Sequence, residues 1–185
     1  MIAEADGEDS HWLHPRQVLR ELEKAMPARA MVSTDIGNIN SVANSYLRFD
    51  EPRSFLAPMS FGNCGYALPT VMGAKVACPD RPAIAYAGDG AWAMSMGELM
   101  TATRHNIPVT SIVFHNRQWG AEKKNQVLWF GDRYVGTDLD NPSFADAKGY
   151  DCAARSGHPC GGQPREKEGG RECVCVEFGR GMCGG

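Results

Sequence analysis

Two short apolar runs, each followed by a polar residue of a kind that binds cations, constrain the fold of this chain more than any other feature. The first run, Ala83-Ile84-Ala85-Tyr86-Ala87, stops at Gly88-Asp89-Gly90, and the second, residues 109–114, stops just before Asn116. Short apolar runs bounded in this way are typical of buried parallel strands. Between them, residues 91–105 carry apolar side chains at spacings of three and four and predict a single helix. This order of elements predicts a parallel strand–helix–strand unit.

The edge of the sheet where both strands end is the expected binding site. A right-handed crossover places Asp89 and Asn116 at the same, carboxyl end of the two strands. Gly88 and Gly90 permit a tight turn into the helix, whose start attracts an anion. Carboxylate and amide oxygens beside bound phosphate suit Mg²⁺, so the pattern predicts a magnesium diphosphate site. The plainer alternative is that Asp89 caps the helix and Asn116 ends a strand.

Gly88-Asp89-Gly90 followed by Asn116 resembles the metal-binding signature of thiamine-diphosphate enzymes. The resemblance implies that Asp89, Asn116 and the backbone carbonyl of Gln118 hold Mg²⁺. One departure is visible, because this chain has His115 where the family usually has a first asparagine. The second asparagine is the ligand, so the metal assignment stands.

The same resemblance implies further contacts with thiamine diphosphate. Residues 59–75 look like the segment that touches the aminopyrimidine ring in the acetolactate synthase and pyruvate oxidase group. Cys64 stands where that group has a bulky apolar side chain that holds the cofactor bent. A thiol is soft and apolar enough for this role, although a plain buried cysteine is the alternative. The loop 35–38 looks like one that lies near the diphosphate, which the backbone N–H groups of Gly90 and Ala91 are expected to face. The implied cofactor-binding residues are Asn38, Asn63, Cys64, Gly88, Asp89, Gly90, Ala91 and Asn116.

Within this group, residues 116–126 and 129–139 most resemble the sulfoacetaldehyde acetyltransferases, which convert sulfoacetaldehyde and phosphate into acetyl phosphate and sulfite. The resemblance implies these small-molecule substrates, and relatives that act on pyruvate are the alternative. Four cationic side chains of these segments are candidates to attract an anionic substrate or phosphate, although a solvated polar face explains each of them equally well. They are Arg117, Lys123, Lys124 and Arg133.

The length and composition of the chain suit one globular domain. With 185 residues and 43% hydrophobic content, the chain can bury one sizeable core. The expected fold class is α/β, a doubly wound parallel sheet that is incomplete at its C-terminal end. We expect residues 1–13 to be the remnant of a linker and residues 14–148 to form an incomplete thiamine-diphosphate-binding domain. A helix from His14 to Met26 and a strand over 30–34 begin this domain.

The other domains of the family are not recognisable in this chain. The resemblance implies that the glutamate that activates the cofactor lies in a missing domain of a partner subunit. No residue of this chain is therefore expected to be catalytic, and the chain alone is expected to be inactive. The intact protein is expected to be a homodimer or homotetramer. The alternatives are a cofactor-binding fragment without turnover and, less favoured because no Gly-x-Gly-x-x-Gly follows a strand, a nicotinamide-binding domain.

The sequence changes character near residue 149. Residues 149–185 hold 10 of the 21 glycines and five of the seven cysteines, with almost no apolar periodicity. We expect this tail to be disordered because it can bury little apolar surface, and a shifted reading frame explains the abrupt change. Disulfides are disfavoured because we find no secretory signal. Zinc binding lacks the usual Cys-x-x-Cys spacing. Its candidate ligands are His158, Cys160, Cys173 and Cys175.

Charge and hydropathy restrict the classes of partner. The formal net charge of −3 and the lack of a basic cluster argue against nucleic acid and an anionic membrane as partners. No apolar stretch is long enough for a membrane span. We therefore expect a cytoplasmic protein that binds small molecules.

Overall fold

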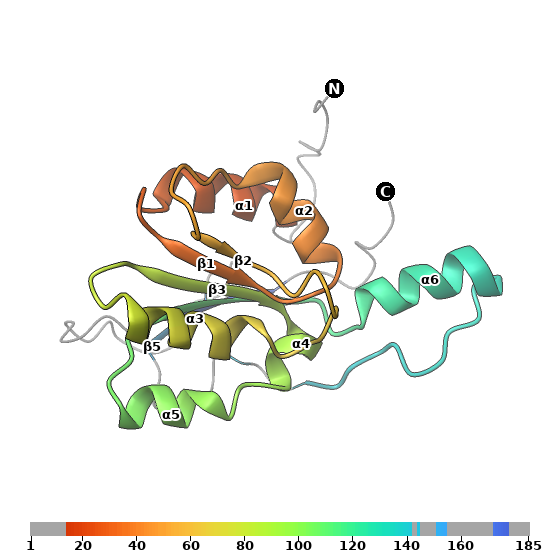
Figure 1. Cartoon of the computed structure of the whole chain (residues 1–185). Coiled ribbons are helices and arrows are strands. Elements are labelled where there is room, and N and C mark those ends of the chain that lie inside the picture. The colour runs from red at the N-terminus through yellow and green to blue at the C-terminus, as the bar shows by residue number, and fades with distance from the viewer. Residues whose placement is uncertain (1–13, 142–143, 145–150, 155–171, 178–185) are drawn as a thin grey trace.

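The chain folds into alternating strands and helices. The computed structural model describes residues 14–141, 144, 151–154 and 172–177. In chain order the elements are α1 (Pro15–Ala25), β1 (Met31–Thr34), α2 (Asn38–Tyr46), β2 (Phe55–Leu56), α3 (Ala67–Ala77), β3 (Ala83–Gly88), α4 (Asp89–Ala93), α5 (Glu98–Arg104), β4 (Thr110–His115), α6 (Gly120–Phe130), β5 (Asp151–Ala154) and β6 (Glu172–Glu177). Helices cover both faces of one sheet (Figure 1), which confirms the predicted doubly wound α/β class.

Within the described residues the sheet has six strands in the order β2-β1-β3-β4-β6-β5, and every neighbouring pair is parallel. The two strands predicted to carry the site are adjacent, since Ile84 pairs with Thr110 and Gly88 with Phe114. The carboxyl ends of β3 and β4 therefore meet at one edge of the sheet, as the sequence predicts.

The side chains of β3 alternate between two apolar cores. Ala83, Ala85 and Ala87 belong to the core beneath α3 and α5, while Ile84 and Tyr86 belong to the core that α1 and α2 cover. Figure 1 shows these two helical layers on opposite sides of the sheet. Burial on both faces explains why the β3 sequence is almost wholly apolar.

The first helix forms as the sequence predicts. His14 caps α1 by accepting a hydrogen bond from the N–H of Arg16, while the Gln17 side chain accepts from the N–H of His14. Pro15 occupies the first turn, where its missing N–H costs nothing. Leu19 is completely buried against the sheet.

The helix predicted over 91–105 is wrong as a single element. The chain forms α4 and α5, separated by a turn over residues 94–97. Trp92 is buried and its indole N–H donates to the Ser111 hydroxyl at 2.7 Å, which fixes α4 on the sheet. Met96 and Met100, which the spacing places with Trp92, are 46% and 73% exposed. The apolar spacing in this stretch therefore does not mark one buried helical face.

Two features near the ends of the sheet differ from the sequence analysis. The short edge strand β2 was not predicted, because two residues are too few to show a period. The expected disorder of residues 149–185 is wrong for β5 and β6, which pair with each other and with β4. The alternation of valine with cysteine in β6 has strand propensity that the surrounding glycines obscure. The rest of this range lies outside the described residues, as do residues 1–13, and the domain boundaries stay predictions.

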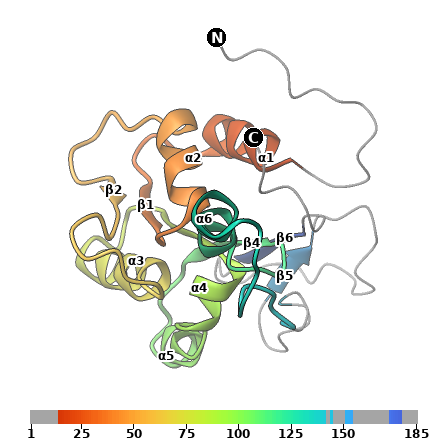
Figure 2. The ribbon, with the colours of Figure 1, turned by 90° about the vertical axis from the view of Figure 1, so that its right-hand side faces the viewer.

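Helix α6 projects away from the sheet. Figure 1 shows α6 extending to one side with its return segment beneath it, and Figure 2 shows the same helix end-on. We call residues 117–139 the α6 arm. No residue of α6 itself is buried. In the part of the chain that the structure describes, no helix is long and apolar enough to cross a membrane.

Candidate functional site

A pocket of about 300 Å³ opens at the carboxyl ends of β3 and β4. It is bounded by the start of α2, the loop before α3, the turn into α4 and the beginning of the α6 arm. Its polar side chains come from Asn38, Asp89, Asn116, Gln118 and Glu122. Its apolar wall includes Ile36, Ile39, Val42, Phe114 and Trp119. A pocket that combines a polar floor with an apolar wall suits a ligand with an ionic end and an aromatic end.

Asp89 lies on the floor of the pocket and is only 1% exposed. One carboxylate oxygen accepts a hydrogen bond from the Arg117 N–H at 2.6 Å, and the other accepts from the Gly90 N–H at 2.9 Å. Burial raises the pKa of Asp89, and these two hydrogen bonds and the nearby His115 ring oppose the rise. The carboxylate is thus fixed in direction and poorly solvated, which favours binding of a cation.

His115 is the buried neighbour of Asp89. Its Nε2 lies 3.7 Å from an Asp89 carboxylate oxygen, and its ring lies 5.1 Å from the ring of Phe144. His115 is 1% exposed at the last position of β4, where its side chain is held inside the domain. The histidine found in place of the usual asparagine therefore contacts the predicted metal ligand directly.

The loop after β4 orients Asn116 and Gln118. The side-chain oxygen of Asn116 accepts a hydrogen bond from the Gln118 N–H at 3.2 Å, and Arg117 adopts a positive φ of 57°. Two backbone bonds join this loop to the end of the arm, from Trp119 N–H to the Thr137 carbonyl and from Leu139 N–H to the Arg117 carbonyl. These bonds fix the carbonyl of Gln118, which the resemblance assigns to the metal.

Trp119 presses the arm against the turn that carries Asp89. A side chain at Gly90 would bring its Cβ within 2.8 Å of two Trp119 ring atoms and 3.0 Å of Leu139 Cδ1. At Gly88 a Cβ would meet no atom within 4 Å. Glycine is thus required at position 90 by close packing, and Trp119 forms a wall of the pocket there.

Asp35 anchors the loop that carries Cys64. Its carboxylate is completely buried at the start of α3 and accepts a hydrogen bond from the Tyr66 N–H at 2.6 Å. Burial raises the pKa of Asp35 against the opposing effect of the backbone N–H groups of Tyr66, Ala67 and Gly65. Burial, followed by the charges of Asp35 and Glu122, raises the pKa of the Cys64 thiol. Cys64 is therefore a neutral, apolar wall residue at neutral pH.

The start of α2 also opens on the pocket. Gly37 precedes this helix with a φ of 128°, a conformation that glycine adopts at little cost, and no side chain caps the helix. Asn38 is the first helical residue and lines the pocket with Gly37. Uncapped backbone N–H groups attract anions, so α2 supplies an electropositive end to the pocket.

The structure brings together most of the residues that the sequence assigns to cofactor and metal. Lining residues among the predicted set are Asn38, Cys64, Gly88, Asp89, Gly90, Ala91, Asn116 and Gln118. Asn63 is partly buried beside Cys64 but does not line the pocket. The Gly90 N–H, which was expected to face a diphosphate, donates to Asp89 instead.

The donor atoms of the pocket match a hard cation. Asp89, Asn116 and Gln118 offer carboxylate, amide and carbonyl oxygens, the ligand types that Mg²⁺ prefers. Among the described residues there is no group of three or more histidine, cysteine, aspartate or glutamate side chains that could hold a metal ion, so a cation here would depend on amide and backbone oxygens beside Asp89. Of the candidate zinc ligands, Cys173 and Cys175 belong to β6, and His158 and Cys160 lie outside the described residues.

None of the four cationic candidates lines the pocket. Lys123 forms an ion pair with Asp138 at 3.0 Å and lies 5.1 Å from the centre of the Tyr134 ring. The side chain of Arg133 donates to the Phe130 carbonyl at 3.0 Å. These two cations brace the arm, and their role in attracting an anion stays a prediction.

Sequence reasoning missed several pocket residues, among them Trp119 and Glu122. Both lie in the short segment after Asn116, whose helix α6 buries no residue and has no clear apolar face. The available signal was the Trp119-Gly120 pair, which follows the strand end closely enough to face the same edge of the sheet.

Comparison with known proteins places this architecture among thiamine-dependent enzymes. Residues 35–160 match the family described as "Thiamine pyrophosphate enzyme, C-terminal TPP binding domain", thiamine pyrophosphate being another name for thiamine diphosphate. The fold is similar to that of a thiamine diphosphate-dependent 4-hydroxybenzoylformate decarboxylase from Rhodococcus jostii RHA1. That similarity has a TM-score of 0.80 and 21% identity, and covers 97% of this chain and 35% of the other.

Sequence relatives narrow the comparison. The chain is 76% identical over 150 residues to sulfoacetaldehyde acetyltransferase of Alcaligenes xylosoxydans xylosoxydans, which covers 79% of this chain and 25% of the relative. It is 48% identical over 137 residues to the sulfoacetaldehyde acetyltransferase of Roseovarius nubinhibens, which covers 74% of this chain and 23% of the relative. The chain is 33% identical over 128 residues to the acetolactate synthase isozyme 2 large subunit of Escherichia coli, which covers 69% of this chain and 23% of the relative. The chain thus spans about a quarter of the length of these curated relatives.

Proposed function

The chain belongs to the thiamine pyrophosphate enzymes, as their C-terminal cofactor-binding domain, and on that premise we propose that it anchors thiamine diphosphate and Mg²⁺ in a sulfoacetaldehyde acetyltransferase. The observation that carries the proposal is the convergence of Asp89, Asn116 and the Gln118 segment on one pocket. The 76% identity to an enzyme of this name supports the choice of substrate. The proposed reaction converts sulfoacetaldehyde and phosphate to acetyl phosphate and sulfite.

The proposed division of labour follows from the chemistry of the pocket. Oxygen atoms of Asp89, Asn116 and Gln118 bind Mg²⁺, which neutralises the diphosphate, and the start of α2 adds an electropositive contact. Cys64 and the apolar wall support the rings and exclude water from one side. When bound, thiamine diphosphate supplies a nucleophilic carbon and an electron sink. We further propose that the intact protein is a cytoplasmic homodimer or homotetramer, in which a domain of a partner subunit completes the cofactor site.

Removal of one metal ligand tests the site. Asp89→Ala and Asn116→Ala in the full-length protein are expected to weaken Mg²⁺-dependent cofactor binding by at least about 100-fold, because each leaves the diphosphate charge poorly compensated. Isothermal titration with thiamine diphosphate at fixed Mg²⁺ measures the effect. Asp138→Ala, which removes a carboxylate from the arm outside the pocket, is the matched control and should bind normally. Unchanged binding in the two ligand variants would contradict the site.

The substrate is tested by assay of the full-length protein with sulfoacetaldehyde, phosphate, thiamine diphosphate and Mg²⁺. Formation of acetyl phosphate and sulfite in equal amounts is the expected result. Consumption of pyruvate without acetyl phosphate from sulfoacetaldehyde would instead favour an acetolactate synthase or pyruvate oxidase type of reaction.

The isolated 185-residue chain should bind cofactor weakly and form no acetyl phosphate, since one wall of a cleft does not exclude water.

A further inference from the structure

Asp35 is a buried carboxylate that the proposed metal and cofactor contacts do not use. It follows β1 directly, is completely buried, and its backbone N–H donates to the Tyr86 carbonyl at 3.2 Å. One carboxylate oxygen accepts a hydrogen bond from the Tyr66 N–H at 2.6 Å, and the other accepts none from the described residues. Within the described part of the chain no cationic side chain forms an ion pair with Asp35. A negative charge on Asp35 is therefore fixed in space and little screened by water.

This charge acts on the part of the pocket that contains Cys64. Cys64 lines the pocket and lies two residues before Tyr66, whose N–H binds Asp35. Burial raises the pKa of the Cys64 thiol, and the charges of Asp35 and Glu122 raise it further, as a negative potential at the sulfur does. We call the part of the pocket around this thiol the Cys64 end. Carboxylates act on the Cys64 end from behind its wall, at Asp35, and from the lining itself, at Glu122.

The pocket has the opposite electrostatic character away from the Cys64 end. The uncapped start of α2 and the Mg²⁺ proposed at Asp89 both attract an anionic group. No lysine, arginine or histidine is among the residues that line the pocket, so no lining cation offsets the carboxylates that act on Cys64. A molecule complementary to the whole pocket thus carries an anionic group at one end and a positive charge near Cys64 at the other.

On the basis of the proposed function, we propose that Asp35 is a positioning residue whose buried negative charge favours the positively charged ring of thiamine diphosphate at the Cys64 end of the pocket. Asp35 acts through space from behind the Cys64 loop and does not touch the ring. This role differs from anchoring the loop. An anchor requires only an oxygen atom that accepts the Tyr66 N–H, whereas a counter-charge requires an ionised carboxylate. Asp35→Asn separates the two roles, because the amide keeps the oxygen and loses the charge.

The negative potential is tested first in the 185-residue chain without cofactor. In Asp35→Asn the pH at which Cys64 reacts with iodoacetamide should fall, and its rate at pH 8 should rise about two- to fivefold, while the maximal rate at high pH stays the same. Peptide mass spectrometry reads each cysteine separately, and Cys78, a free cysteine at the end of α3, is the internal reference. Asp50→Asn, which removes an exposed carboxylate outside the pocket, is the matched control and should leave Cys64 unchanged. Equal Cys64 profiles in Asp35→Asn and wild type would overturn the placement of the charge.

The role is tested in the full-length protein by binding alone, with two ligands that differ in one charge. Thiamine diphosphate has a positively charged ring nitrogen, and 3-deazathiamine diphosphate has a neutral carbon in its place and the same diphosphate. At about pH 8 and fixed Mg²⁺, Asp35→Asn should weaken binding of thiamine diphosphate about five- to thirtyfold and that of the deaza analogue by less than about twofold. Asp35→Ala, which also releases the Tyr66 N–H, should weaken both ligands and change the ratio of their affinities by the same factor. A loosened loop alone would weaken both ligands equally, so the ratio reports the charge.

The outcomes distinguish this inference from the proposed function. If the wild-type protein binds both ligands and their affinity ratio is unchanged in Asp35→Asn, the counter-charge is overturned and the proposed function stands. If the wild-type protein binds neither ligand in the presence of Mg²⁺, the proposed function and this inference fail together. Normal cofactor binding in Asp89→Ala would overturn the metal site without altering the ratio expected for Asp35→Asn.

Discussion

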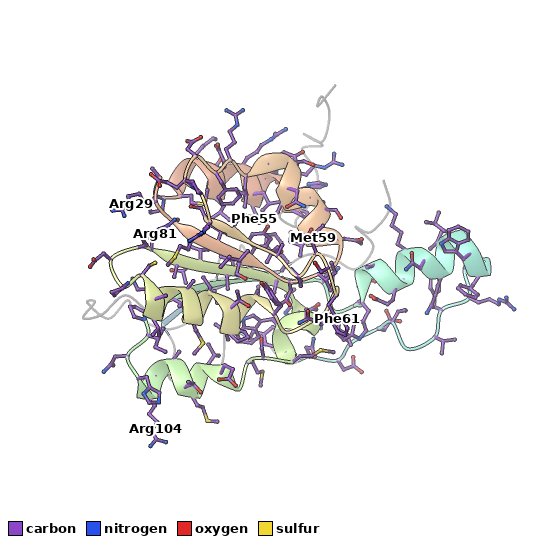
Figure 3. All side chains as sticks on the ribbon, in the orientation of Figure 1. Arg29, Phe55, Met59, Phe61, Arg81 and Arg104 are labelled. Carbon is purple, nitrogen blue, oxygen red and sulfur yellow. The ribbon has the colours of Figure 1, made fainter. Side chains whose placement is uncertain are left out.

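The floor of the pocket and the α6 arm differ in the kind of side chain that each one buries. On the floor, the charged side chains of Asp35 and Asp89 are buried, and backbone N–H groups hold both carboxylates in place. In the arm, the apolar side chains are the exposed ones, since Trp129 is 76% and Leu128 62% exposed. Figure 3 shows side chains standing out around α6, with Arg29 and Arg81 at the opposite end of the strands.

The arm nevertheless satisfies its polar groups internally. The Gln126 side chain forms two hydrogen bonds with the backbone of Val135, and Lys123 pairs with Asp138. The carboxylates on the floor are therefore held by hydrogen bonds within the domain. The apolar side chains of the arm, in contrast, are not covered by any of the described residues. Substitutions on the floor should therefore change the free energy of unfolding, and substitutions on the tip of the arm should not.

The largest change in stability is expected at Asp35. Asp35→Ala leaves the Tyr66 N–H without its acceptor at the start of α3, and should cost about 2–3 kcal/mol of the free energy of unfolding. Asp35→Asn keeps a side-chain oxygen for this bond and should cost less. Urea unfolding of the 185-residue chain, followed by tryptophan fluorescence, measures both. Equal stability of Asp35→Ala and wild type would remove Asp35 as an anchor of the loop.

The pH dependence of the Asp35→Asn variant sharpens this prediction. Because burial raises the pKa of Asp35 in the folded chain, ionisation of this residue opposes folding. The contribution of Asp35 to the free energy of unfolding is fully present below the pKa of this group in the unfolded chain, near 3.8. It is lost as the pH rises through the raised pKa of Asp35 in the folded chain. Asp35→Asn should therefore gain stability relative to wild type between pH 4 and pH 7. A constant difference over this range would contradict the assignment.

The junction of floor and arm is expected to be the next most sensitive point. Gly90→Ala places a Cβ within 2.8 Å of the Trp119 ring, so the ring must move, at a cost of about 1–2 kcal/mol. The displaced ring should also weaken cofactor binding, because Trp119 lines the pocket. Gly88→Ala, which meets open space at a φ of −70°, is the matched control and should fold like wild type. If both variants unfold alike, close packing is not the reason for glycine at position 90.

The tip of the arm should be nearly neutral for the stability of the isolated chain. Trp129→Ser with Phe130→Ser should change the free energy of unfolding by less than about 0.5 kcal/mol, because both side chains are mostly exposed. The same pair should raise the solubility of the chain, since it removes part of an exposed apolar surface. Light scattering and urea unfolding measure the two effects. A loss above about 1 kcal/mol would show that the tip packs on the domain.

The smallest effect is expected from the ion pair that braces the arm. The Lys123 and Asp138 side chains are 26% and 62% exposed, and such pairs contribute about 0–1 kcal/mol. Asp138→Asn should therefore lower stability by a few tenths of a kcal/mol at most, and less at high salt. The Lys24–Glu21 pair on α1, whose side chains are 67% and 71% exposed, gives the reference value for a more exposed pair through Glu21→Gln.

The sequence was a good guide wherever burial on the two faces of the sheet set the pattern. The runs that became β3 and β4, and the residues at their ends, predicted where Asp89 and Asn116 would meet, because parallel strands end at a common edge. Prediction failed where that constraint was weak. The split between α4 and α5 depends on how Trp92 is fixed on the sheet, which no local spacing reveals. The arm buries no residue of α6, so no periodicity marks it, and β6 is obscured by the glycine-rich sequence around it.

The order of the strands has a consequence for synthesis of the chain. β6 lies between β4 and β5, although it follows both in the sequence. On the ribosome β5 is therefore made before the strand with which it pairs, and one edge of β4 stays open until residues 172–177 have emerged. Open strand edges of nascent chains pair readily with other chains. A translational pause before residue 172 would therefore prolong the time for which this edge of β4 is open to other chains.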